Sequence, residues 1–234
     1  MKKITSVLFL FYCFSVGWAQ TVPPCTLEIT DAETFARDWT VIDVNSNVSA
    51  NTWAYNDGNA MYTQDKSNAA DDWLIAPAVT LEAGKAYKVS AYVKHSSTFG
   101  SDKQKIELKI GTAPTVEGLT TRLVYDESFQ SRLFVEKSGT FSPAESGVFY
   151  VGLRCYSESY NGDLYFQKIV IEEAPVYPAQ ITDLSIVAGE RGAMSATLSW
   201  TWPSSDHLGG ALSNLLGAKI YRGTDLVATL DTAT

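Results

Sequence analysis

The chain has 234 residues, 45% of them hydrophobic, with 26 acidic and 18 basic side chains and a formal net charge of −8. This length and composition can supply the core of one large domain or of one and a half ordinary ones. The acidic balance excludes nucleic acid and anionic membrane as partners, because both bind through clustered Lys and Arg that displace counterions.

The first 19 residues are typical of a secretory signal peptide. Lys2 and Lys3 precede an apolar run from Ile4 to Val16, and Gly17 and Ala19 follow at A-x-A-like spacing. Cleavage after Ala19 removes two lysines and no acids, so the formal charge of the mature chain becomes −10. The apolar run is short for a membrane span. We therefore predict a secreted or cell-surface protein, without membrane insertion once the signal is cleaved.

Short segments of alternating or β-branched residues, separated by turn formers, predict an all-β protein. The only helix candidate is residues 31–39, where Asp31 can cap the N-terminus and Glu33 suits the first turn. In a short strand from Trp73 to Ala76, apolar side chains occupy both faces, so both faces should be covered. The clearest strands are residues 86–94, 105–111, 121–128, 147–157 and 163–173.

Pro175 and Pro178 bracket a segment that cannot continue a sheet ladder. We therefore predict a linker at 175–178, between one domain at 25–174 and a second region at 179–234. Strand signals in the second region lie at 181–188, 195–202, 218–222 and 225–230. Within the second of these strands, Leu198, Trp200 and Trp202 alternate and should share one face that fills a core.

Two cysteines remain after signal cleavage, Cys25 and Cys155, in a compartment that permits oxidation. They either form a disulfide or remain as one buried thiol and one thiol in the N-terminal segment, and the sequence leaves both alternatives open. We take the Cys25–Cys155 disulfide as the prediction. It would place the N-terminal segment beside the strand that contains Cys155.

Three segments, "DWTVIDVNSNVSANTW", "DDWLIAPAVTLEAGKAYKVSAYVK" and "SGVFYVGLRCYSESYNGDLYFQKIVIEE", resemble the cleaved-adhesin or choice-of-anchor J domains of bacterial surface proteins. The resemblance covers about residues 25–174 and implies a jelly-roll β-sandwich in which Trp73 to Pro77 opens a strand. The region after residue 178 resembles a fibronectin type III domain, through Trp200 and the stretch "KIYRGTDLVATL".

A fibronectin type III sandwich needs seven strands, and about four are signalled before the sequence stops at Thr234. The expectation is a partial immunoglobulin-like sandwich with an exposed Trp200 or Trp202. The chain would then be a truncated gene product or a fragment of a longer protein with further domains.

The resemblance also implies a structural calcium ion, because related modules carry an acidic loop just before a tryptophan. The corresponding residues here are Asp43, Asn45 and Asn47, whose side-chain oxygens suit a hard cation. Two carboxylates of that pattern are missing, and the late strand reads Gln167 and Lys168 where relatives carry acids. The alternative is a solvated turn in which these side chains bind their own backbone.

Catalytic signatures are absent from the sequence. The two histidines, His95 and His207, belong to different predicted domains, whereas hydrolytic zinc sites take three protein ligands together. There is no zinc-protease helix motif, no nucleophile elbow and no phosphate loop. We therefore predict that the chain is not an enzyme.

Ligand recognition is the remaining candidate function. Aromatic side chains in polar stretches can stack on sugar rings or anchor a protein ligand. Tyr55, Tyr62, Tyr156 and Tyr160 are the predicted ligand-binding residues, and Trp53 is assigned to the core. The leading hypothesis is a non-catalytic adhesion module for an extracellular glycan or protein. The alternatives are an accessory region of a larger secreted peptidase or other hydrolase, and a stalk component without a dedicated ligand.

Overall fold

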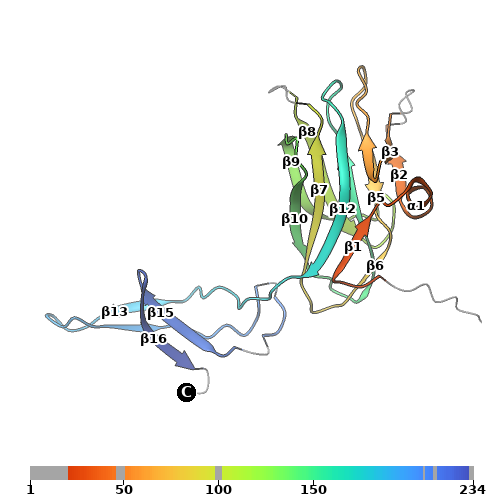
Figure 1. Cartoon of the computed structure of the whole chain (residues 1–234). Coiled ribbons are helices and arrows are strands. Elements are labelled where there is room, and N and C mark those ends of the chain that lie inside the picture. The colour runs from red at the N-terminus through yellow and green to blue at the C-terminus, as the bar shows by residue number, and fades with distance from the viewer. Residues whose placement is uncertain (1–20, 46–50, 98–101, 208, 213–214, 232–234) are drawn as a thin grey trace, which may run out of the picture.

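The computed structural model describes residues 21–45, 51–97, 102–207, 209–212 and 215–231 (Figure 1). The predicted signal peptide and Asn47 lie outside these ranges. Strands dominate the described part, and its one α-helix has seven residues, which confirms the all-β prediction. Crossing a membrane would take a longer and more apolar helix than any in these ranges.

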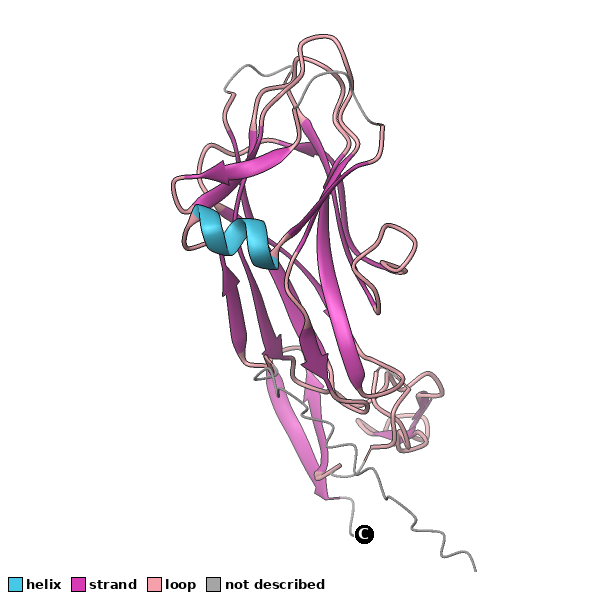
Figure 2. Cartoon of the chain, turned by 90° about the vertical axis from the view of Figure 1, so that its right-hand side faces the viewer, coloured by secondary structure: helices cyan, strands magenta, loops and turns pink. Residues whose placement is uncertain are grey.

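Residues 21–174 form a β-sandwich of two antiparallel sheets, seen as two layers of strands in Figure 2. We name each sheet after its central strand. The β12 sheet contains, in spatial order, β10 (Val135–Phe141), β7 (Tyr87–His95), β12 (Leu164–Glu173), β4 (Asn59–Tyr62) and β3 (Trp53–Asn56), and β1 (Cys25–Glu28) also pairs with β12. The β11 sheet contains β2 (Thr40–Asp43), β5 (Asp72–Ile75), β11 (Gly147–Cys155), β8 (Gln104–Gly111) and β9 (Thr121–Phe129), and β6 (Val79–Leu81) also pairs with β11.

The core lies between the two sheets and follows from the alternation of side chains along each strand. On β11 the buried residues Phe149, Val151, Leu153 and Cys155 face inward. Edge-to-face ring pairs reinforce the core, such as Phe141 with Phe149 at a centroid distance of 5.3 Å. Because the odd-numbered residues of β11 fill the core, its even-numbered residues are directed to the outer face of the sheet.

The predicted helix is confirmed as α1 (Ala32–Asp38), which lies against one side of the sandwich (Figure 2). Asp31 caps it, and its Oδ1 accepts a hydrogen bond of 2.7 Å from the backbone N–H of Thr34. Phe35 is buried, and the ring of Trp39 after the helix packs edge-to-face against Phe166 at 5.3 Å. The helix is therefore held by its N-cap and by one apolar side.

The region after Pro178 forms two separate two-stranded ribbons, which Figure 1 shows outside the sandwich. They are β13 (Ser185–Ala188) with β14 (Ala196–Ser199), and β15 (Gly217–Arg222) with β16 (Asp225–Asp231). β14 ends at Ser199, so the predicted strand to Trp202 is too long. Trp200 and Trp202 contact each other edge-to-face at 5.7 Å and are half-buried, which corrects the expectation of an exposed tryptophan. Large apolar side chains elsewhere on the ribbons, including Ile186 and Met194, are exposed.

The predicted Cys25–Cys155 disulfide is wrong, because both cysteines are free thiols. Cys25 lies on β1 opposite Ile171, near the end of β12, whereas Cys155 ends β11 in the other sheet. From Cys155 the chain passes through the β11–β12 connection and enters β12 at Leu164. Ile171 lies seven residues further along β12, which corresponds to about 23 Å at the usual rise of a strand. The two cysteines therefore lie toward opposite ends of the sandwich.

Thiol reactivity should reflect these two environments. Complete burial raises the pKa of Cys155 to about 12, and partial burial raises the pKa of Cys25. In the protein that begins at Gln20, we expect Cys155 to resist a thiol reagent in the folded state and both thiols to react in denaturant. The variant Cys25→Ser should show one reactive thiol in denaturant instead of two. A titration of the unfolded protein that finds no thiol would restore the disulfide.

Candidate functional site

A continuous row of side chains crosses the outer face of the β11 sheet. In the strand registers, Ile42 on β2 lies opposite Trp73 on β5, and Trp73 lies opposite Arg154 on β11. Arg154 in turn lies opposite Glu107 on β8, and Glu107 lies opposite Tyr125 on β9. Directly opposed side chains on one face of a sheet are close enough to interact. The row begins in apolar packing at Ile42 and Trp73 and ends at an exposed tyrosine on the edge strand.

A β-bulge on β9 brings Arg122 onto the same face as Tyr125, although the two are three residues apart. Leu108 pairs with Val124 and Lys109 pairs with Arg122, so Leu123 is the extra residue on β9. Bulges of this kind re-aim side chains. The Arg122 guanidinium consequently lies over the Tyr125 ring, 4.7 Å from its centroid.

Tyr125 and Tyr156 stack at the edge of this face, with ring centroids 6.1 Å apart and planes inclined by 23°. Tyr125 is 50% exposed, and Tyr156 is half-buried. The Arg154 guanidinium lies 5.0 Å from the centroid of the Tyr156 ring. The Tyr156 hydroxyl is shielded from solvent and has no hydrogen-bond partner among the described residues. The pKa of Tyr156 is raised above its ordinary value, mainly because the hydroxyl is buried and secondly because of the adjacent Tyr125 side chain.

A network of charges fixes the polar side chains between the aromatic rings. The Glu107 side chain is only 2% exposed and accepts a 2.6 Å hydrogen bond from Nε of Arg122, with Arg154 Nη1 at 3.5 Å and Lys109 Nζ at 3.6 Å. Asp71 holds Arg154 from the other side through two bonds of 2.7 and 2.9 Å. These bonds to Asp71 raise the pKa of Arg154. Fork-to-fork pairing of this type orients a guanidinium strongly.

The connection from β8 to β9 closes one end of the face. Leu119 in this connection is buried against Trp73 and Ile75 on the outer side of the sheet. Gly152 permits the contact, because a Cβ there would lie 2.4 Å from Leu119 Cδ1 and 3.1 Å from the Trp73 ring. The surface beside this connection, which we call the Tyr125–Tyr156 face, consists of Asp71, Arg122, Tyr125, Arg154 and Tyr156, with Glu107 buried beneath them.

The tyrosines predicted from the sequence fall into different environments. Tyr62 is 2% exposed and packs edge-to-face against Trp53, which corrects its assignment to a ligand-binding surface and confirms Trp53 as core. Tyr55 is half-buried against the core. Tyr160 is 63% exposed in the β11–β12 connection, with a positive φ of 64°. Of the four, only Tyr156 belongs to the Tyr125–Tyr156 face.

The residues predicted to bind calcium lie at the end of β2. Asp43 is opposite Asp72 in the register, and Asn45 donates a 2.7 Å hydrogen bond from Nδ2 to the carbonyl of Ala69. Asp72 is buried and its Oδ1 has no partner among the described residues. Burial, with the nearby charges of Asp43 and Asp71, raises the pKa of Asp72 to about 6. Within the described ranges, no three Asp, Glu, His or Cys residues are grouped to hold a metal ion.

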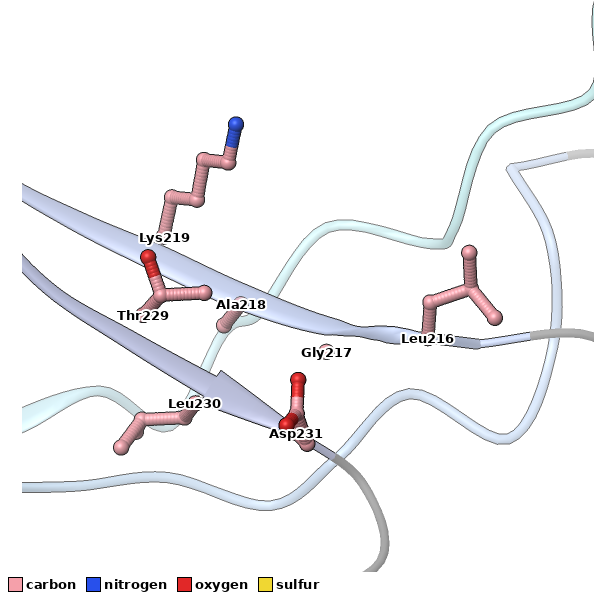
Figure 3. A pocket seen from close by; sticks show the side chains of 7 residues that line it. All are labelled: Leu216, Gly217, Ala218, Lys219, Thr229, Leu230 and Asp231. Atoms are coloured by element: carbon pink, nitrogen blue, oxygen red, sulfur yellow. The ribbon is translucent and has the colours of Figure 1, made fainter.

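A hollow of about 310 Å³ at the open end of the β15–β16 ribbon is lined by Leu216, Gly217, Ala218, Lys219, Thr229, Leu230 and Asp231 (Figure 3). In Figure 3 the Lys219 side chain extends away from Gly217. Small and aliphatic side chains dominate the lining, and it contains no aromatic ring. It therefore offers weaker chemistry for recognition than the Tyr125–Tyr156 face.

Neither the protein-family models nor the curated proteins compared with this sequence match it. Among solved structures, the K1 cleaved adhesin domain of Lys-gingipain from Porphyromonas gingivalis W83 has a TM-score of 0.45 at 14% identity, covering 64% of this chain and 99% of that domain. The K3 domain of the same protein has a TM-score of 0.45 at 12% identity, covering 62% and 92%.

The CBM22-1 xylan-binding domain from Paenibacillus barcinonensis Xyn10C has a TM-score of 0.39 at 14% identity, covering 67% of this chain and 97% of that domain. Identities at this level assign no family to the chain.

Calcium binding at Asp43 and Asn45 remains a prediction, and melting temperature tests it. A cation beside Asp43 would also offset the repulsion that disfavours an ionised Asp72. Because a ligand specific for the folded state adds about 2.7 kcal/mol at 100 times its Kd, saturating calcium should raise the melting temperature above that in chelator. Asp43→Asn should remove the shift, and Glu117→Gln, in an exposed loop, should retain it. Identical melting curves with calcium and with chelator would end the hypothesis.

Proposed function

We propose that the chain is an exported, non-catalytic module that binds an extracellular glycan on the Tyr125–Tyr156 face. The supporting observation is the stacked pair of Tyr125 and Tyr156 beside an ordered network of charged hydrogen-bonding groups. Aromatic rings offer flat apolar surfaces to the C–H faces of sugars, and neighbouring charged groups hydrogen-bond to hydroxyls.

The charges on this face favour a neutral sugar. Each cation of the face has an acidic partner, since Arg122 binds Glu107 and Arg154 binds Asp71. The Tyr125–Tyr156 face therefore presents hydrogen-bond donors and acceptors together, without a large excess of positive or negative charge. Vicinal hydroxyls of a neutral sugar, which donate and accept at once, are complementary to such an alternation.

The side chains of the Tyr125–Tyr156 face are already held in place, which favours affinity for the ligand. Glu107 is buried, and Arg154 is held by Asp71 and packs over the rings of Tyr156 and Trp73 at 5.0 and 5.7 Å. Ligand binding would freeze few additional side-chain rotamers, and each rotamer-rich side chain already fixed saves about 0.5 to 1.5 kcal/mol. A protein ligand would need a wider patch, because stable protein interfaces bury about 800 Å² on each partner.

Substitution of the two tyrosines tests the proposal. In a screen of neutral oligosaccharides followed by titration calorimetry, Tyr125→Ala and Tyr156→Ala should each weaken binding about tenfold, the upper range for one aromatic contact. Tyr221→Ala, at a comparably exposed tyrosine of β15, should bind as the unmodified protein does.

Three outcomes would contradict the proposal. Binding that survives Tyr125→Ala within twofold would place the ligand elsewhere. Equal loss in Tyr221→Ala would show a non-specific effect. Failure of every neutral oligosaccharide to bind would overturn the assignment of the Tyr125–Tyr156 face to neutral glycans.

A further inference from the structure

A small pocket lies at the other sheet, where β7 ends and β12 begins. It has a volume of about 190 Å³ and is lined by Lys94, His95, Ser96, Arg132 and Tyr165. Backbone hydrogen bonds tie three connections together here, from His95 N–H to the Ser131 carbonyl at 2.6 Å and from Ser96 N–H to the Asp163 carbonyl at 2.9 Å. The lining is therefore anchored by the sheet and by its neighbouring loops.

Lys94 is held in place by two aromatic rings. Its Nζ lies 4.5 Å from the centroid of the Tyr165 ring and 4.9 Å from that of Phe134. Tyr165 is directly opposite Lys94 in the β12–β7 register. Such a sandwich orders the long side chain before any ligand arrives.

The two cations of the pocket have no acidic partner. Among the described residues, neither Lys94 nor Arg132 forms an ion pair, although lysines and arginines elsewhere on the sandwich, such as Lys137 and Arg154, do. All Asp and Glu residues of the sequence lie within the described ranges, so the remaining segments contain no acidic side chain that could pair with Lys94 or Arg132. In a chain of net charge −8, two unpaired cations around one hollow form a local positive site.

Acids that follow or precede the pocket residues in the chain have other partners, and Glu136, which follows Arg132 closely, pairs with Lys88 at 2.5 Å. Asp163 Oδ1 accepts a hydrogen bond of 3.0 Å from the backbone N–H of Gln64, and Asp102 accepts one of 2.5 Å from the Ser97 hydroxyl. Neither acid makes an ion pair with Lys94 or Arg132.

Ser96, which also lines the pocket, adds a hydrogen-bond donor. The Ser96 hydroxyl oxygen accepts a 2.7 Å bond from the Asp163 N–H, which leaves its own hydrogen to donate. Lys and Arg side chains can only donate. A pocket of about 190 Å³ holds the equivalent of about six waters, which is room for one small charged group.

We propose that this Lys94–Arg132 pocket binds an anionic oxygen group, a sulfate or a carboxylate, carried by an acidic glycan. The pocket is on the β12 sheet, so it is separate from the Tyr125–Tyr156 face and does not depend on the function proposed for that face. Its ligand class follows from an excess of donors over acceptors, in contrast to the balanced charges of the β11 sheet.

Calorimetry on the chain from Gln20 to Thr234 tests the pocket with four probes. These are a sulfated hexasaccharide, a uronic acid hexasaccharide, a neutral hexasaccharide and inorganic sulfate. We expect one or both acidic hexasaccharides to bind, more weakly as salt is raised. Inorganic sulfate should compete, and the neutral hexasaccharide should not bind at this pocket. Whether the sulfated or the uronic acid probe binds better identifies the anionic group.

Two substitutions locate the binding. Lys94→Met keeps an unbranched side chain between Phe134 and Tyr165 and removes the charge, and Arg132→Gln changes an exposed loop residue that should not affect folding. Each should weaken the acidic hexasaccharide about tenfold, as expected for loss of one charge-assisted hydrogen bond. Lys219→Met, at an exposed lysine of β15, is the matched control and should have no effect. Tyr125→Ala should also leave this binding unchanged.

Several results would overturn the proposal. These are no binding of either acidic hexasaccharide, equal binding of the neutral one in competition with sulfate, or full affinity in Arg132→Gln. An equal loss in Lys219→Met would show that only overall charge matters.

Discussion

The packing of the inner faces of the two sheets is the interaction on which the rest of the structure depends. Burial of apolar surface between them fixes the register of every strand, because a slip by one residue would exchange the buried and exposed side chains. On β11, burial of Leu153 and Cys155 forces Arg154 outward, and Tyr156 follows on the same side. Core packing thus also determines which side chains form the Tyr125–Tyr156 face, because they are the alternate residues of the same strands.

Irregularities in the strand registers modify this alternation, and two of them place charged residues where strict alternation would not. On β9 the extra residue Leu123 aligns Arg122 with Tyr125, and on β12 the irregularity between Phe166 and Lys168 sets Lys168 over the Tyr92 ring at 5.1 Å. Both sheets therefore carry cation and aromatic pairs on their outer faces. Lys168 and Lys88 on the β12 sheet pair with Glu28 and Glu136, whereas Lys94 on the same sheet has no acidic partner among the described residues.

The sequence predicts the long strands well, because their alternation is local. The strands near Ala86, Lys105, Thr121, Gly147 and Asp163 are all present within a few residues, and so is the helix capped by Asp31. Tyr62 is misassigned because polar neighbours hide a strand in which it faces inward. Tyr125 is missed because its partners Glu107 and Tyr156 come from other strands, and the pairing of distant strands and the bulge at Leu123 leave no local signal.

Cys155 ends β11 beside Gln104, with its sulfur 3.4 Å from the Gln104 Oε1, and Cys25 lies in a different sheet. Within the described residues the sandwich is consequently held by packing, hydrogen bonds and ion pairs, without a disulfide. Its folding needs no oxidant and no isomerase to sort sulfur pairs. Among the described residues, neither the packing between the two sheets nor the outward placement of Arg154 and Tyr156 depends on a sulfur–sulfur bond, so a reducing agent should leave the fold unchanged.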